Sequence, residues 1–228
     1  MFTLSPAALA ASIDHTLLDL DASDAQIAQL CQEAQAEGFA AVCIYPKFLP
    51  LAYQWQQRLA PAKFKLAAVI DFPLGQSTPE ERYAQATEAV QNHAQELDLV
   101  LNRELLRQKK YAEIYEELRR FKQLNAATKL ILETSLLTYP EKIAAMALVG
   151  AAQIMMAKTS TGVYGKATAE DVALLAELAG GHVGIKASGG IRTLAQATLM
   201  LQAGATRLGT SHAMSIMQEA HATKQNFS

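Results

Sequence analysis

The sequence contains few of the residues typical of disulfide-bonded or nucleic-acid-binding proteins. Its 228 residues include one tryptophan and two cysteines, Cys31 and Cys43. Two cysteines cannot form a disulfide framework, and we expect both to be free thiols. Lysine and arginine number 20 and aspartate and glutamate 22, giving a net charge of −2. That balance argues against a general nucleic-acid-binding protein.

The sequence also contains no obvious export signal and no long hydrophobic run. Residues 1–6 do not include the basic stretch with which a signal peptide begins. The most apolar segment, residues 143–157, is shorter than the ~20 residues that a membrane-spanning helix needs. We interpret it as a buried helix followed by a buried strand. We therefore expect a cytoplasmic protein that does not associate with membranes.

The chain alternates regularly between strand-like and helix-like segments. Short runs of apolar residues are each followed by a segment with helical periodicity. The predicted strands are residues 12–16, 40–44, 65–70, 97–101, 129–132, 153–158, 183–186 and 206–209. The longest predicted helix covers about residues 104–124. Without any plausible linker, this pattern predicts one α/β domain over residues 1–228, a closed (β/α)8 (TIM) barrel, with an open doubly wound sheet as the alternative.

Two lysines stand at the ends of otherwise apolar strands. Lys158 ends the sixth predicted strand, Lys186 ends the seventh, and Asp98 interrupts the fourth. A buried ammonium group loses its hydration, so a lysine in such a position can give up its proton and attack a carbonyl carbon. If both lysines share one cavity, each charge disfavours the other, and Asp98 between them offsets part of the cost. The pattern predicts Schiff-base chemistry.

Turns rich in glycine follow the last three predicted strands, at residues 159–162, 188–192 and 209–211. Glycine lets the backbone approach an anion closely, and amides at the start of a helix point toward it. In (β/α)8 barrels the loops after the seventh and eighth strands commonly bind phosphate. We therefore expect a phosphorylated substrate.

Seven motifs in this order resemble the signatures of the deoxyribose-phosphate aldolases, which are class I (Schiff-base) aldolases. They are found at residues 13–18, 41–46, 71–75, 96–100, 130–134, 158–162 and 184–192. The resemblance covers nearly the whole chain. It implies reversible cleavage of 2-deoxy-D-ribose 5-phosphate into acetaldehyde and D-glyceraldehyde 3-phosphate, a step in deoxyribonucleotide catabolism. It implies no metal and no cofactor, because a protonated imine itself stabilises the carbanion. A homodimer is also expected, since related barrels often pair.

The resemblance also implies a role for individual residues. Lys158 forms the imine, Lys186 keeps Lys158 nucleophilic, and Asp98 acts with a bound water in dehydration and in enamine protonation. Contacts with the substrate are implied for Asp14, Cys43 and Thr161. The residues implied to hold the phosphate are Gly162, Gly189, Gly190, Gly209 and Ser211.

Alternatives remain open from the sequence. Pocket shape rather than the lysine sets the substrate, so a Schiff-base aldolase for another phosphorylated carbonyl compound is one alternative. A barrel that binds a sugar phosphate without catalysis is another. The family's Ser-Ser pair after the eighth strand is Ser211-His212 here, so either one phosphate contact is absent or an imidazole replaces it. Some relatives end in a tyrosine that reaches the site, whereas this chain ends Asn226-Phe227-Ser228.

Overall fold

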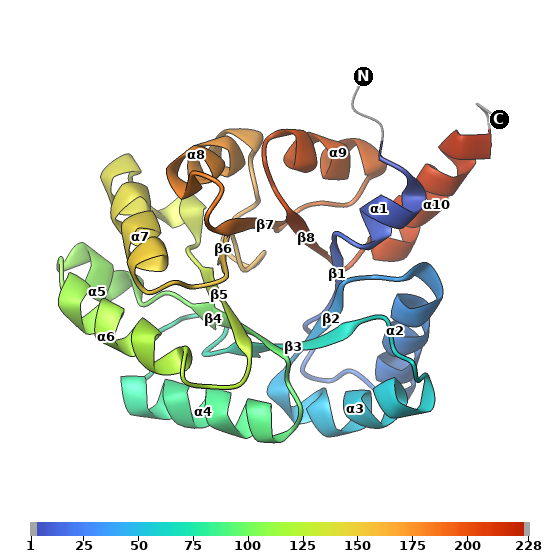
Figure 1. Cartoon of the computed structure of the whole chain (residues 1–228), viewed down its shortest axis with the longest axis horizontal. Coiled ribbons are helices and arrows are strands. Elements are labelled where there is room, and N and C mark those ends of the chain that lie inside the picture. Colours follow the sequence, from blue (N-terminus) through green and yellow to red (C-terminus); the bar gives the residue numbers. More distant parts are fainter. Residues whose placement is uncertain (1–3, 226–228) are drawn as a thin grey trace.

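Eight parallel strands close into a barrel surrounded by helices in the computed structural model, which describes residues 4–225 (Figure 1). The strands are β1 (Ile13–Leu17), β2 (Ala41–Ile44), β3 (Lys65–Ile70), β4 (Glu96–Val100), β5 (Ala127–Ile131), β6 (Met156–Lys158), β7 (Gly184–Ser188) and β8 (Arg207–Thr210). The α-helices are α1 (Pro6–Ala10), α2 (Asp24–Glu37), α3 (Leu49–Arg58), α4 (Pro79–Gln91), α5 (Arg103–Arg107), α6 (Tyr111–Phe121), α7 (Tyr139–Ala151), α8 (Ala169–Ala179), α9 (Leu194–Gln202) and α10 (Ala213–Gln225). Short 3₁₀ helices cover Pro46–Phe48 and Thr134–Leu136.

The pairing of β1 decides between the two predicted architectures. This strand pairs in parallel with β2 on one side and with β8 on the other, so the sheet has no free edge. The closed (β/α)8 barrel is therefore confirmed and the open doubly wound sheet is excluded. Strands covered on both faces explain the continuous apolar runs in the sequence, because neither face of the sheet meets water.

Local signals in the sequence set where several helices begin. Ser23 and Thr78 each accept a hydrogen bond from the backbone three residues on, and Gln26 and Glu81 return one. Pro79 occupies the first turn of α4, where its missing N–H costs nothing. The reciprocal bonds of Thr78 and Glu81 form a capping box that fixes the start of α4.

The structure corrects the predicted long helix at residues 104–124. It divides into α5 and α6, and Lys109 between them has a left-handed backbone with φ of 59°. The break reorients the chain so that both Leu106 of α5 and Ile114 of α6 are buried. The sequence analysis also missed α1, which Ser5 caps and which packs against α10.

Two kinds of interior result from this barrel. Outward-facing strand residues and inward-facing helix residues form a large apolar core, which includes Ile27, Leu66 and Leu97. Inside the barrel, however, the buried side chains include several charged groups. Among residues 4–225, no helix combines the length and the hydrophobicity needed to cross a membrane.

Candidate active site

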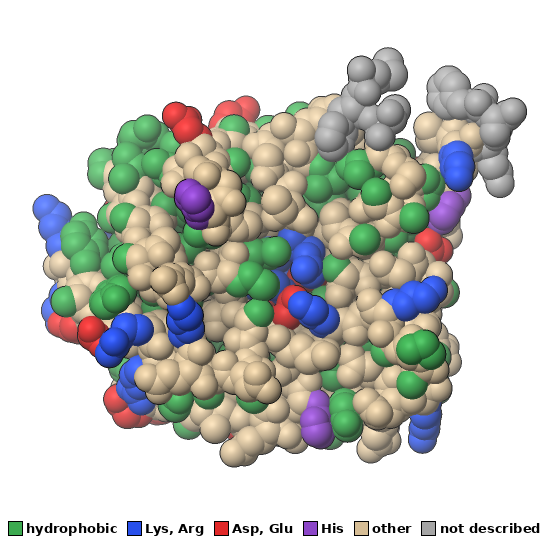
Figure 2. Space-filling view, viewed as in Figure 1, with side chains coloured by type: hydrophobic (Ala, Val, Ile, Leu, Met, Phe, Trp, Pro, Cys, Tyr) green, Lys and Arg blue, Asp and Glu red, His purple; other side chains and the backbone are tan. Residues whose placement is uncertain are grey.

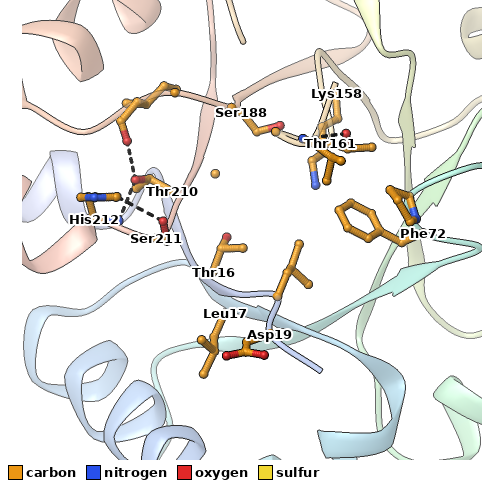
Figure 3. Close-up of a pocket in the computed structure, with 18 of the residues that line it drawn as sticks. Thr16, Leu17, Asp19, Phe72, Lys158, Thr161, Ser188, Thr210, Ser211 and His212 are labelled. Carbon is orange, nitrogen blue, oxygen red and sulfur yellow. Dashed lines mark hydrogen bonds between the residues drawn. The ribbon is translucent and has the colours of Figure 1, made fainter. Parts of the chain in front are cut away.

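A pocket of about 470 Å³ opens where the strands end and the following loops begin. Lys158 and Thr161 line one side of it with Phe72, and Ser211 and His212 line the opposite side (Figure 3). Side chains of both charges also gather near the centre of the face shown in Figure 2. In (β/α)8 barrels this end of the strands carries the chemistry.

Lys158 and Lys186 are neighbours, as predicted. They are register partners on β6 and β7, so their side chains enter the barrel at the same level. Each Nζ donates to the same oxygen of Asp98: the distance to Oδ2 is 2.8 Å from Lys158 and 2.7 Å from Lys186. Asp98 thus links the two lysines, and all three side chains are at least 97% buried, with exposures of 3% for Lys158 and 0% for the other two.

A deeper layer of charge, which the sequence analysis missed, supports this group. Lys129 Nζ lies 3.0 Å from Asp98 Oδ1, 3.0 Å from Asp14 Oδ2 and 2.5 Å from Glu96 Oε2. Arg207 reaches Asp14 Oδ1 at 2.6 Å. Lys129 was predicted only as the first residue of a strand, but the spacing of Glu96 and Asp98, two residues apart, places both carboxylates on the inner face of β4.

These contacts shift the pKa values of the buried groups. Burial alone raises the pKa of Asp98, but Lys129, Lys158 and Lys186 outweigh it and hold that pKa well below its usual value. Burial lowers the pKa of Lys186, yet Asp14 and Asp98 reverse the effect and the net shift is upward. Asp98 is therefore a carboxylate and Lys186 an ammonium. The sequence predicted Asp98 between the two lysines and a substrate contact for Asp14, but not the ion pair of Asp14 with Lys186, in which Oδ2 lies 2.5 Å from Nζ.

Asp14 and Cys43 lie beneath the pocket rather than along its wall. Both are fully buried, and neither is among the residues that line the pocket. Burial, followed by the charge of Asp98, raises the pKa of the Cys43 thiol to about 11, which keeps it protonated at neutral pH. Asp14 contacts three cations of the barrel interior. Their contact with a substrate stays a prediction, while both cysteines are free thiols as expected.

The glycine-bearing turns meet in the pocket. The lining includes the predicted residues Thr161, Gly162, Gly189, Gly190, Gly209 and Ser211, together with Arg192 and His212. The imidazole of His212 forms a hydrogen bond with the neighbouring Ser211, with 3.1 Å between Nδ1 and Oγ. Residues 226–228, which stand where some relatives end in a tyrosine, lie outside the described part of the chain.

Glu133 organises the turn after β6. Its carboxylate accepts hydrogen bonds from Ser160 Oγ, from the Thr161 amide at 3.1 Å and from Thr161 Oγ1 at 2.5 Å. Glu133 therefore orients the turn that directly follows Lys158. The signal that could have revealed this role is an acidic residue two positions after an apolar strand.

Gly209 lines the pocket and also leaves room for the side chain of Lys186. A side chain there would place its Cβ 3.0 Å from Lys186 Cε and 3.0 Å from Ser188 Cβ. The missing side chain therefore leaves space for the Lys186 stem inside the barrel.

Sequence comparison agrees with this geometry. A model of the DeoC/LacD family aldolases matches residues 8–219. This chain belongs to the DeoC/LacD aldolase family. It is therefore an aldolase, a lyase that acts on a carbon–carbon bond, and the fold class and family predicted from the sequence are confirmed.

Relatives in this aldolase family cover nearly all of the chain. The deoxyribose-phosphate aldolase of Shouchella clausii is 45% identical over 216 residues, which are 93% of this chain and 96% of the relative. That of Halalkalibacterium halodurans is 43% identical over 213 residues, or 92% and 94%. The solved deoxyribose phosphate aldolase of Aeropyrum pernix, described as a tetramer, superposes with a TM-score of 0.88 at 33% identity, covering 96% of this chain and 93% of that one.

Proposed function

We propose that this aldolase cleaves 2-deoxy-D-ribose 5-phosphate reversibly into acetaldehyde and D-glyceraldehyde 3-phosphate, through an imine on Lys158. The observation that carries the proposal is the position of Lys158. Among the charged residues linked in the barrel interior, as far as residues 4–225 show, it is the one that also lines the pocket. A nucleophile needs that combination of contact with the proton-handling groups and access to the substrate.

Imine formation comes first. The lone pair of Lys158 Nζ attacks C1 of the open-chain sugar, and the carbinolamine loses water to give a protonated imine. Asp98 acts with a pocket water to accept the amine proton and to return a proton to the departing hydroxyl group. The hydrogen bond between Lys158 Nζ and Asp98 Oδ2 supports this assignment. Lys186, which stays an ammonium, donates to the same Asp98 oxygen as Lys158 and so holds that carboxylate beside the reacting amine.

Carbon–carbon cleavage follows. The C3 hydroxyl loses its proton to water, the C2–C3 bond breaks, and its electron pair moves into the imine to form an enamine. D-glyceraldehyde 3-phosphate leaves as the aldehyde made from C3. The enamine then takes a proton at C2, and hydrolysis of the resulting imine releases acetaldehyde and regenerates the amine. The nearby carboxylates Asp14 and Asp98 make the barrel interior favourable for the transient cationic imine.

The pocket's shape supports one orientation of the substrate. Thr210 and Ser211, in the turn after β8, lie on the side opposite Phe72 in Figure 3, so a phosphate held by that turn leaves the sugar's C1 near Lys158. Arg192 on the same lining adds a positive charge for the phosphate.

Substrate comparison tests the proposal. Purified protein is incubated with 2-deoxy-D-ribose 5-phosphate, D-ribose 5-phosphate or unphosphorylated 2-deoxy-D-ribose, and the aldehydes released are measured. We expect kcat/KM for the first to exceed that for either other sugar by at least about 100-fold, because the pocket recognises both ends of the molecule. Better cleavage of another sugar phosphate would favour a different Schiff-base aldolase, and binding without cleavage would favour the non-catalytic barrel.

Gly189→Ala tests the phosphate end. Gly189 has φ of 95°, and an added Cβ would lie 2.8 Å from the carbonyl oxygen of Gly165. The substitution therefore displaces one glycine turn against the other, and we expect KM for the phosphorylated sugar to rise about tenfold or more. The slow turnover of unphosphorylated 2-deoxyribose should change little.

Gly181→Ala is the matched control for this experiment. Gly181 has a comparable φ of 79°, but an added Cβ meets no atom within 4 Å, and the residue is not in the pocket lining. An equal rise in KM in both variants would contradict the assignment of Gly189 to the phosphate end.

Two further parts of the proposal concern the cell and the assembly. The reaction takes place in the cytoplasm, which two buried free thiols support. Two chains form a homodimer, which light scattering coupled to size-exclusion chromatography tests directly. A mass of one chain or of four chains would contradict the dimer.

A further inference from the structure

A buried ion cluster outside the barrel adjoins the wall of the pocket. Arg82 of α4 is 1% exposed, and it reaches Asp71 in the loop after β3 and Glu117 on α6. Arg82 Nε lies 3.4 Å from Asp71 Oδ2, and Nη1 lies 3.3 Å from Glu117 Oε2. Nη2 donates to the backbone oxygen of Val100, at the end of the strand that carries Asp98. The cluster formed by Asp71, Arg82 and Glu117 is called the α4 brace below.

The brace fixes an unusual turn. Asp71 has a left-handed backbone, with φ of 52°. Its carboxylate oxygens accept from the amide of Ser77 at 3.0 Å and from Ser77 Oγ at 2.9 Å. The Asp71 amide donates to Gln85 Oε1 at 2.6 Å. A non-glycine residue keeps such a conformation only when its surroundings hold it, and here α4 supplies both Arg82 and Gln85.

Phe72, the next residue, projects into the pocket on the side of Lys158 (Figure 3). Its ring packs edge-on against Tyr45, with 6.0 Å between ring centroids. Together with Leu18, these rings cover the small cluster of Ala41, Cys43, Ala67 and Val69 inside the barrel. The apolar wall therefore stands beside the amine and across the pocket from Thr210 and Ser211 in the turn after β8 (Figure 3).

We infer that Phe72 limits the donor aldehyde to two carbons, and that the α4 brace is the device that positions it. This inference rests on the proposed function. With the phosphate at the glycine turns and C1 on Lys158, a substituent on C2 of the enamine extends toward the apolar wall. Acetaldehyde has no such substituent, whereas propanal adds one methyl group. One methylene group in an apolar pocket changes selectivity by about 10–200-fold.

The fold alone does not require this cluster. Burial raises the pKa of Glu117, and the charge of Arg82 offsets the effect only in part, so the second carboxylate is costly to bury. Apolar residues of similar volume often replace a buried ion cluster without loss of stability. A role in positioning explains why one guanidinium group joins the Asp71 turn, the end of β4 and α6.

Arg82→Met tests the inference through donor selectivity. Imine formation on Lys158 by acetaldehyde and by propanal is measured by borohydride reduction and mass spectrometry, and aldol addition of each donor to D-glyceraldehyde 3-phosphate is followed. We expect the preference for acetaldehyde to fall about tenfold, because Phe72 is no longer held. Arg82→Lys keeps the charge, but an ammonium group cannot reach Asp71, Glu117 and the Val100 oxygen at once as the guanidinium group does. This variant should therefore restore part of the preference for acetaldehyde.

Arg119→Met on α6 is the matched control, because Arg119 is exposed and its Nε forms an ion pair with Glu116 Oε2 at 3.4 Å, away from the α4 brace. It should leave selectivity unchanged.

Asp71→Asn is the second test variant, to be used if Arg82→Met does not fold. Asparagine tolerates the left-handed backbone and keeps the shape of the side chain, but it removes the charge that faces Arg82. The preference for acetaldehyde over propanal should fall in this variant too. Loss of stability with an unchanged donor preference in the folded variants would overturn the inference. Failure of the wild-type protein to cleave the sugar phosphate would instead refute the proposed function.

Discussion

Replacing Lys158 by alanine abolishes turnover and leaves the barrel folded. The amine that forms the covalent intermediate is lost, so we expect kcat to fall by at least about 10⁴-fold. The fold survives because Asp98 keeps two cations, Lys129 at 3.0 Å and Lys186 at 2.7 Å. Steady-state rates and thermal unfolding followed by circular dichroism measure the two effects separately.

Lys63→Ala is the control for this experiment. Lys63 is exposed and precedes β3, at the opposite end of the barrel from the pocket. It should keep wild-type rates. Retained activity in Lys158→Ala would mean that another residue is the nucleophile, and loss of the folded state would leave Lys158 with a structural role instead.

Lys129→Met should damage both stability and rate. Lys129 is fully buried and contacts three carboxylates, which the substitution leaves facing one another with less compensating charge. Removing one partner of a buried ion pair costs about 3–5 kcal/mol. We also expect kcat to fall about 100-fold, because Asp98 Oδ1 loses the contact that keeps Oδ2 directed at Lys158 and Lys186. Denaturant unfolding and steady-state kinetics provide the measurements.

A second substitution separates charge from packing in this prediction. Glu96→Gln removes one of the three carboxylates that Lys129 contacts, so the double variant Lys129→Met/Glu96→Gln should recover part of the lost stability. Strictly additive effects of the two substitutions would show that the charges of Lys129 and Glu96 are not coupled. Such a result would contradict the network described in the barrel interior.

Most of the fold could be predicted because its signals are local. The strands are short apolar runs, and helix starts such as Thr78-Pro79 contain both a capping residue and proline. The break between α5 and α6 could not be predicted in this way. It depends on Lys109 adopting a left-handed backbone, a conformation that lysine rarely prefers and that tertiary packing imposes here.

The site was predicted where a charge interrupts an apolar strand, as at Asp98, Lys158 and Lys186. Lys129 and Arg207 were missed because the predicted strands, residues 129–132 and 206–209, place them at the first and second positions, where a charged residue usually faces water. Only closure of the barrel shows that they point inward, toward Asp14 from the first strand. Phe72 lies within the motif at residues 71–75, but its position beside Lys158 depends on the Asp71 turn, which Arg82 of α4 holds in place.

The most direct test of the central claim is reduction with sodium borohydride in the presence of acetaldehyde, followed by peptide mass mapping. A reduced imine adds an ethyl group to the amine that formed it. The account predicts this modification on Lys158, concurrent with loss of activity, and none on Lys186 or Lys129. An ethyl group on either of those lysines, or an enzyme that borohydride and acetaldehyde leave unmodified and active, would contradict it.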